Sequence, residues 1–152
     1  MTKSIKKTML MLVLTCASLS MLFSGSRLPV NVYASEAMTP YYNNVVTVDS
    51  AATISSSGKL TARYSYDGRQ GVTTKAVVTT YVEKKTLGLF WSKVDIGTTN
   101  DEWVDTVYNY THTGSHSVQL TSTGTYRITF EFAIYGNGGA ADEFTKVKEI
   151  KY

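Results

Sequence analysis

Hydrophobic and polar residues alternate strictly along residues 124–135. The apolar parity consists of Tyr126, Ile128, Phe130, Phe132 and Ile134. The opposite parity is mostly polar. Because successive side chains of a β-strand point to opposite faces of a sheet, this pattern predicts a strand with one buried and one largely solvated face. The stretch indicates an all-β protein.

Shorter segments with strand character fill most of the remaining chain between turn signals. The expected strands span residues 45–54, 60–66, 72–84, 91–96, 103–110, 124–135 and 144–152, with a further short strand beginning at Val118. Turns are expected at residues 55–58, 67–68, 111–114, 121–124 and 136–139. Seven to nine short strands at this spacing predict a two-sheet antiparallel β-sandwich, with a small barrel as the alternative.

Two details near the C-terminus refine this expectation. Residues 136–139 read Gly-Asn-Gly-Gly, the strongest hairpin signal in the chain, because these residues accept positive φ. Residues 140–148 are the only segment with a helical alternative, and their periodicity is weak. A period fault near Val147 predicts a β-bulge in the last strand.

The N-terminus has the organisation of a secretory signal peptide. Three lysines precede an apolar run over residues 9–23, and small residues follow, so we expect cleavage after Ala34, with Ala37 as second choice. A retained membrane anchor is the alternative, although the run is shorter than the roughly 20 residues of a spanning helix. The organisation is then a signal peptide at 1–34, an irregular lead-in at 35–44 and one β-sandwich domain at 45–152.

Export changes the cysteine and charge balance. The single cysteine, Cys16, lies inside the apolar run, where lipidation is not expected, so the mature chain has no disulfide or thiolate chemistry. Four of the 15 basic residues lie in residues 1–34, which leaves 11 against 12 acidic residues, a net charge of −1. No basic stripe for nucleic acid remains. The expected location is extracellular or loosely associated with the cell wall.

A tyrosine pattern narrows the sandwich type. Tyr126 follows Leu120 and Gly124 at the start of the most regular strand, where immunoglobulin-like domains carry a tyrosine whose hydroxyl bonds the backbone just upstream. Ile128 stands where such domains place a cysteine, so the chain resembles the disulfide-free immunoglobulin-like sandwiches of bacterial surfaces. The order of residues 55–59, 82–85 and 124–127 resembles small secreted proteins of Gram-positive bacteria with an uncharacterised immunoglobulin-like domain. This resemblance implies fold and export, and carries no catalytic residue.

Few residues suggest metal chemistry. His112 and His116 are separated by a Thr-Gly-Ser segment that reads as a turn, so we expect solvated turn histidines. An acidic cluster from Asp101 to Asp105 has ligands that calcium accepts, but not the spacing of a calcium loop. A solvated strand edge is the simpler interpretation, and calcium binding there stays open. No metal site or cofactor is expected.

Signs of catalysis are equally sparse. The chain lacks a Gly-x-Ser-x-Gly elbow, and its mature part lacks a cysteine nucleophile. No pair of carboxylates is marked for sugar hydrolysis, although two acids need only meet in space. We therefore expect a protein that is not an enzyme, and a glycosidase-like activity is an alternative.

Aromatic residues suggest binding instead. The mature chain holds ten tyrosines and two tryptophans. Exposed aromatic faces stack on sugar rings and are common in protein interfaces, whereas strand propensity and packing would also explain them. The candidate ligand-binding residues are Tyr81, Trp91, Tyr108, Tyr110 and Tyr135. The expected function is a secreted non-enzymatic binding module for cell-wall glycan or a surface protein; the oligomeric state is not predicted.

A second candidate surface is the apolar segment at residues 87–91. Leu87, Leu89 and Phe90 lie between Lys84-Lys85 and Lys93. At a hairpin tip they would meet solvent, and the flanking lysines would suit an anionic membrane or wall polymer. A small secreted toxin or bacteriocin-like factor acting on membranes is therefore the alternative function. Alternatively, the leucines fold over the open end of the sandwich. The latter is the simpler expectation, because the ends of a sandwich need covering.

Overall fold

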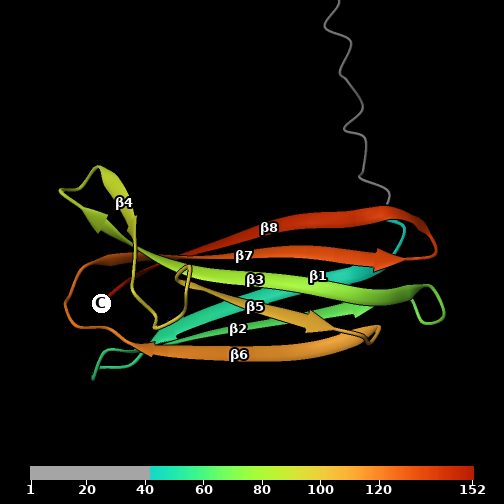
Figure 1. Cartoon of the computed structure of the whole chain (residues 1–152). Helices are drawn as coiled ribbons and strands as arrows, with labels where there is room; N and C mark the ends of the chain where they lie inside the picture. The colour runs from blue at the N-terminus through green and yellow to red at the C-terminus, as the bar shows by residue number, and fades with distance from the viewer. Residues whose placement is uncertain (1–41) are drawn as a thin grey trace, which may run out of the picture. The chain divides into compact units, whose positions relative to one another are not determined.

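The computed structural model describes residues 42–152, which form eight β-strands and no helix (Figure 1). The predicted signal peptide, its cleavage sites and Cys16 lie outside the described residues, as does most of the expected lead-in. The strands are β1 (Val45–Ile54), β2 (Lys59–Gly68), β3 (Thr73–Thr86), β4 (Phe90–Lys93), β5 (Glu102–Val107), β6 (Thr111–Gln119), β7 (Thr125–Gly136) and β8 (Gly139–Lys151). The all-β class and the expected number of strands are confirmed.

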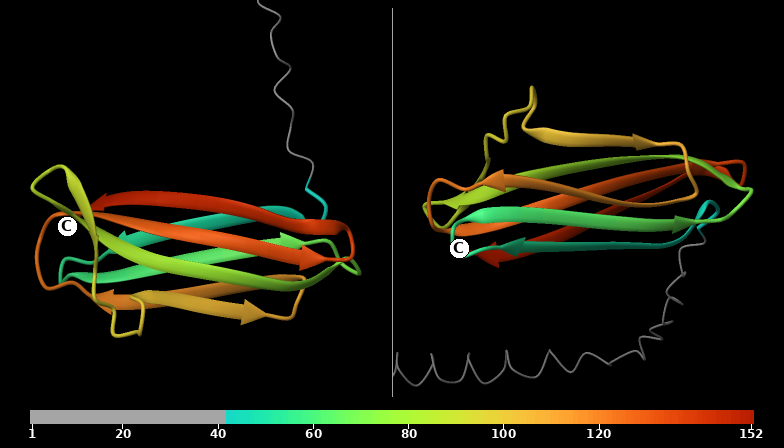
Figure 2. Two further views of the ribbon diagram at one scale, coloured as in Figure 1. Left: turned by 45° about the horizontal axis from the view of Figure 1, so that its top comes forward. Right: turned by 90° about the horizontal axis from the view of Figure 1, so that it is seen from below.

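The strands form two antiparallel sheets that face each other as a sandwich (Figure 2). The smaller sheet has the order β1-β2-β6, and the larger has the order β4-β3-β7-β8, with β5 also paired to β3. Strands β4 and β5 share one edge of β3: β5 pairs along Ala76 to Tyr81, and β4 pairs along Glu83 to Thr86. The long β3 therefore serves the sandwich with its first part and a separate hairpin with its last.

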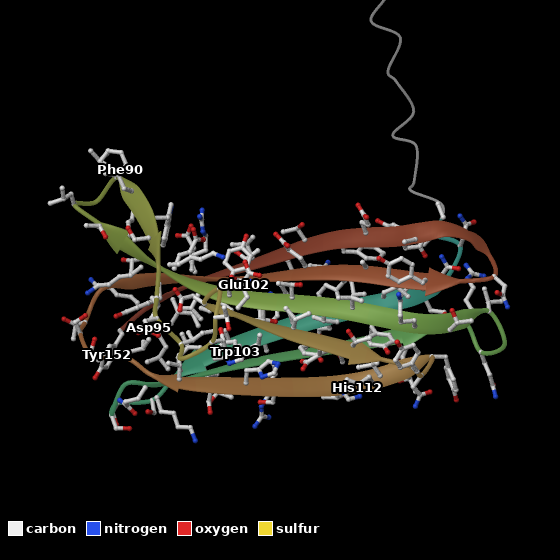
Figure 3. All side chains as sticks on the ribbon, viewed as in Figure 1. Phe90, Asp95, Glu102, Trp103, His112 and Tyr152 are labelled. Atoms are coloured by element: carbon white, nitrogen blue, oxygen red, sulfur yellow. The ribbon has the colours of Figure 1, made fainter. Side chains whose placement is uncertain are left out.

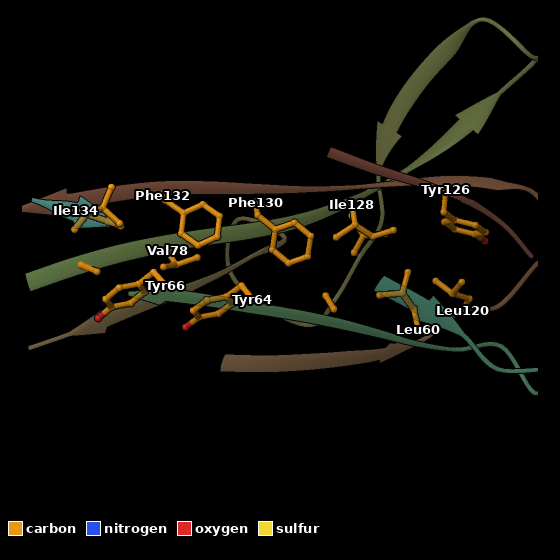
Figure 4. Close-up of a cluster of buried hydrophobic side chains, with 14 residues drawn as sticks. Leu60, Tyr64, Tyr66, Val78, Leu120, Tyr126, Ile128, Phe130, Phe132 and Ile134 are labelled. Atoms are coloured by element: carbon orange, nitrogen blue, oxygen red, sulfur yellow. The ribbon is translucent and has the colours of Figure 1, made fainter. Parts of the chain in front are cut away.

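The core lies between the sheets and follows the predicted parity (Figure 4). All five apolar residues of the regular strand are buried, as expected for β7 between β3 and β8. The opposing sheet contributes chiefly β2, whose buried residues also alternate. These β2 residues are Leu60, Ala62, Tyr64 and Tyr66. The alternation in both sheets explains why the sandwich fold was readable from the pattern alone.

The tyrosine at the start of β7 makes the expected backbone contact. The buried Tyr126 hydroxyl donates a hydrogen bond to the Ser122 carbonyl oxygen at 2.5 Å, four residues upstream. The Lys84 ammonium lies 5.7 Å from the centre of the same ring. The hydrogen bond from Tyr126 fixes the turn that leads into β7, since it anchors the backbone of the turn to a core side chain.

The segment expected to turn at residues 111–114 is instead the start of a strand. β6 runs from Thr111 to Gln119 and pairs with β2 without a break. Gly114 lies beneath the Tyr64 ring, and a Cβ there would come within 2.2 Å of it. The glycine thus marks a close approach between neighbouring strands rather than a turn, and the prediction of a turn here was wrong.

The C-terminal expectations are partly corrected. The hairpin at residues 136–139 is confirmed, although only Gly139 among them has a positive φ, at 135°. The helical alternative for residues 140–148 is wrong, and the register of β8 is continuous past Val147, so no bulge lies there. The period fault has another cause: β8 is an edge strand, and Lys146 and Lys148 occupy its core-side parity. Lysines on an edge strand discourage pairing with other chains.

The chain leading into β1 is locked to the start of β8. The buried carboxylate of Asp142 accepts hydrogen bonds from the backbone N–H groups of Asn43, Asn44 and Val45, at 2.7 to 3.1 Å. The Asn44 side chain in turn donates to the carbonyl oxygens of Ile134 and Ala140. Residues 42–152 thus contain both sheets, the core and the bonds that hold the start of β1 to β8, so we expect this part of the chain to fold on its own.

Candidate functional site

The outer face of the five-stranded sheet gathers three of the five aromatic candidates. Directly paired residues of neighbouring strands share a face. The pairings of Tyr81 with Thr129, of Lys85 with Trp91 and of Lys75 with Tyr135 place these aromatic rings away from the core. We call this surface the outer face. The sequence predicted the candidates singly, and the strand register is what brings them onto one surface.

A hollow lies in the middle of the outer face, over β3, β7 and β8. Its volume is about 340 Å³. Its lining combines apolar groups with hydroxyl and carboxylate groups. The lining residues are Val77, Thr79, Glu131, Phe132, Ala133, Glu143, Phe144 and Thr145. The sequence carries no signal for this site, because its residues come from three strands and share no spacing motif.

Tyr81 is positioned beside this hollow. Its hydroxyl donates a hydrogen bond to Oε1 of Glu131 at 3.2 Å. Burial raises the pKa of Tyr81, and the charges of the nearby glutamates add to the shift. The raised pKa keeps the phenol protonated, and therefore a hydrogen-bond donor, to a higher pH than that of an ordinary tyrosine.

Each aromatic ring of the outer face also has a cation above it. Lys93 lies 5.0 Å from the ring centre of Tyr81, and Lys75 lies 4.3 Å from that of Tyr135. Trp91 has two cations, with Arg127 at 4.4 Å and Lys85 at 5.4 Å. Pairs at exposed sites contribute only about 0.5–1 kcal/mol. Little interaction energy is therefore lost when a ligand takes the place of the lysine over Tyr81 or Tyr135.

The other two aromatic candidates lie elsewhere. Tyr108 and Tyr110 both lie in the connection between β5 and β6, at the end of the sandwich opposite the β3–β4 hairpin (Figure 1). Their exposed fractions are 79% and 38%. The structure thus does not join them to Trp91 in one site.

The β3–β4 hairpin stands away from the sheets near one end of the sandwich (Figures 1 and 3). We call Leu87, Gly88, Leu89 and Phe90 the hairpin tip. The exposed fractions of its large side chains are 85% for Leu87, 75% for Leu89 and 63% for Phe90. The expectation that the leucines fold over the open end was wrong. Strand β4 also ends at Lys93 rather than at residue 96, so the hairpin is short.

Both histidines are half-buried in a strand, and one of them joins the two sheets. The Asp105 Oδ2 atom of β5 accepts a hydrogen bond from the Tyr64 hydroxyl of β2 at 2.5 Å, and His116 Nε2 of β6 lies 2.6 Å from it. Trp103 stacks on His116 with ring centres 5.0 Å apart. We call Tyr64, Trp103, Asp105 and His116 the Asp105 clasp. The expectation of solvated turn histidines was wrong, and no sequence spacing linked these four residues.

The hydrogen bonds of the Asp105 clasp hold the two sheets together. Burial, the hydrogen bond to Asp105 and the charge of that carboxylate together raise the pKa of Tyr64 well above its ordinary value. The phenol is therefore a permanent donor at neutral pH. Both strong donors converge on one carboxylate oxygen, which joins β5 of the larger sheet to β2 and β6 of the smaller one.

The acidic residues from Asp101 to Asp105 do not form one cluster, because each of the three has a different partner. Glu102 forms an ion pair with Lys93, and Asp105 belongs to the clasp. Asp101 lies at a positive φ of 54° and accepts a hydrogen bond from the backbone N–H of Ile96 at 3.4 Å. Within residues 42–152, no group of three or more histidine, cysteine, aspartate or glutamate side chains is placed to hold a metal ion.

Two further findings bear on function. Comparison with protein-family models and with curated proteins gave no match for this chain. In the described part of the chain, no helix has the length and apolarity needed to cross a membrane.

Proposed function

We propose that this domain is a secreted, non-enzymatic binding module and that its outer face binds cell-wall glycan. The observation that carries the proposal is the hollow of about 340 Å³ with Tyr81 at its side. This volume lies within the range of small-ligand sites, about 300–1,000 Å³. Export itself is a prediction from the leader sequence.

The chemistry of the hollow suits a neutral sugar. Glu131 and Glu143 offer hydrogen-bond acceptors to sugar hydroxyls, and Thr79 and Thr145 offer groups that both donate and accept. The Tyr81 ring beside them offers an apolar face for a pyranose ring. Two carboxylates in the same hollow oppose an anionic polymer, so the favoured ligand is an uncharged saccharide segment.

The immunoglobulin-like type of the sandwich is part of this proposal. The sheets β1-β2-β6 and β3-β7-β8 have the order expected of strands A-B-E and C-F-G, with β4 and β5 added beside β3. The Tyr126 hydrogen bond to Ser122 supports the same assignment. In this arrangement the outer face belongs to the sheet that carries strands C, F and G.

The test is retention of purified residues 35–152 on washed walls of a Gram-positive bacterium. Tyr81→Ala and Glu131→Ala should each lower retention about tenfold, as expected for central contact residues. Tyr108→Ala is the matched control, since it removes an exposed tyrosine from the other end and should leave retention unchanged.

Two outcomes would overturn the proposal. Retention that disappears after the walls are treated with protease would identify a surface protein as the partner. Release of reducing sugar ends into the supernatant, lost in Glu131→Gln or Glu143→Gln, would show a glycosidase.

A further inference from the structure

The hairpin tip holds three large, highly exposed apolar side chains that are close neighbours in the chain. Leu87, Leu89 and Phe90 are each more than 60% exposed. Scattered apolar residues on a surface need no explanation, whereas a cluster of large ones marks an interaction site or an aggregation risk. Phe90, at the start of β4, stands clear of the sandwich (Figure 3).

The backbone of the tip makes its leucine unusual. Leu87 has a φ of 52° and Gly88 a φ of 71°, and the Leu89 N–H donates to the Thr86 carbonyl oxygen at 3.1 Å. Such a turn favours asparagine followed by glycine, and a bulky residue at positive φ is strained. Leucine at this position gives the fold neither an easy turn nor core contacts. Its exposed side chain is therefore the feature that needs a function.

The base of the hairpin is basic. Trp91 is half-buried just behind the tip, beneath Lys85 and Arg127. Among the described residues, Glu83 is paired with Arg127, whereas Lys84 and Lys85 have no acidic partner. Apolar side chains at the tip, an aromatic ring behind them and lysines at the base are the order in which a bilayer presents acyl chains, interface and anionic headgroups.

The space beneath the hairpin adds to this arrangement. A hollow of about 470 Å³ separates the hairpin from the sandwich end. Its polar lining includes two lysines, four aliphatic hydroxyl groups, an amide and one carboxylate: Lys84, Lys93, Thr86, Ser92, Thr121, Ser122, Gln119 and Asp95. The Lys84 ammonium donates to the Ser122 hydroxyl at 2.6 Å. Ammonium and hydroxyl groups are the donors that a lipid phosphate accepts.

From these observations we infer that the hairpin tip inserts into the surface of an anionic lipid bilayer. A strand rises about 3.3 Å per residue, so the tip reaches about 7–10 Å beyond the pair formed by Lys85 and Trp91. That depth matches the 5–10 Å of a protein element lying in the interface of a bilayer. A stable protein partner would need about 800 Å² of buried surface on each side, which a tip of four residues does not supply.

The experiment is sedimentation of residues 35–152 with vesicles of phosphatidylcholine alone and of phosphatidylcholine mixed with phosphatidylglycerol. The wild-type protein should sediment with the anionic vesicles, less so as salt rises, and much less with phosphatidylcholine alone. Phe90→Asp and Leu87→Asn should each lower the bound fraction about tenfold or more. Val46→Ser removes an exposed apolar residue from β1 and should bind as the wild type does.

Leu87→Asn separates function from folding, because asparagine suits this turn and should make the domain more stable while it weakens vesicle binding. Absence of wild-type sedimentation, equal sedimentation with both lipids, or unchanged binding by Phe90→Asp would each overturn the inference. The glycan proposal fails independently: Tyr81→Ala should keep vesicle binding, and Phe90→Asp should keep retention on cell walls.

Discussion

The β7–β8 turn and the β3–β4 turn lie at opposite ends of the sandwich and differ in how tightly they pack against it. The β7–β8 turn is packed: a Cβ on Gly136 would come within 2.4 Å of the Val72 carbonyl oxygen, and one on Gly138 within 2.7 Å of the Asn43 carbonyl oxygen. The β3–β4 turn is free, since a Cβ on Gly88 would meet no atom within 4 Å. The packed turn has small and polar residues, and the free turn has leucines and a phenylalanine. Apolar residues thus face solvent at the turn that has no packing role.

The largest expected difference in stability between the two turns comes from replacing one glycine in each with alanine. Gly136→Ala should lower the free energy of unfolding by about 3 kcal/mol, because the new Cβ meets backbone and the Asn44 amide oxygen. Gly88→Ala should cost about 1 kcal/mol, since only its positive φ is unfavourable. Urea unfolding measures both. Equal losses in the two variants would mean that the β7–β8 turn is no more tightly packed than the β3–β4 turn.

A smaller effect is the pH dependence of the free energy of unfolding, which we expect to depend on the sandwich core and not on the hairpin tip. Folding raises the pKa of Tyr64 and Tyr66 above the ordinary value of 10.0. The unfolded chain therefore loses these protons first, and the stability they provide is complete below pH 10 and lost as the pH rises above it. Each tyrosine should lower the free energy of unfolding by about 1 kcal/mol per pH unit there.

Urea unfolding at intervals between pH 8 and pH 11 measures this slope. Tyr64→Phe should reduce the slope, although it lowers stability at pH 8 because Asp105 loses a donor. A variant of the hairpin tip such as Leu89→Ser should leave the slope unchanged, since none of the tip side chains titrates. A slope that Tyr64→Phe does not alter would contradict this assignment.

The smallest effect is a gain. Leu87→Asn should raise the free energy of unfolding by about 0.5 kcal/mol, because asparagine adopts positive φ at lower cost than leucine. Thermal or urea unfolding beside the wild type measures the change. A loss of stability would show that the Leu87 side chain supports the fold, and would remove the main reason for assigning it a binding role.

The strands whose residues contact the core were the readily predicted ones. Alternation at Ile128, Phe130 and Phe132 records burial directly, because one face of β7 packs in the core. The segment from Thr111 to Gln119 lacks hydrophobic alternation, because β6 lies at the edge of the smaller sheet and all of its residues are half-buried or exposed. Its polar sequence and Gly114 resemble a turn, and only pairing with β2 makes it a strand.

The candidate sites divide in the same way. Leu87, Leu89 and Phe90 are neighbours in the chain, so the sequence could present them as one surface, and only their exposure had to be learned. In the Asp105 clasp, Tyr64 bonds a residue 41 positions away, and the hollow beside Tyr81 joins residues as far apart as Val77 and Thr145. No local pattern encodes such meetings, because they depend on strand order and register.

The sequence by itself determined the all-β class, the core parity of β7 and the hairpin at residues 136–139, since each follows from alternation or from local turn chemistry. The hydrogen bond of Tyr126 was expected from the resemblance to immunoglobulin-like domains. Tertiary structure alone decided that β6 is a strand, that His116 meets Asp105, that Tyr81 borders a hollow and that the leucines of the hairpin tip face solvent. The physical reason is that burial along one strand is a local property, whereas contact between strands depends on loop closure and pairing across the whole domain.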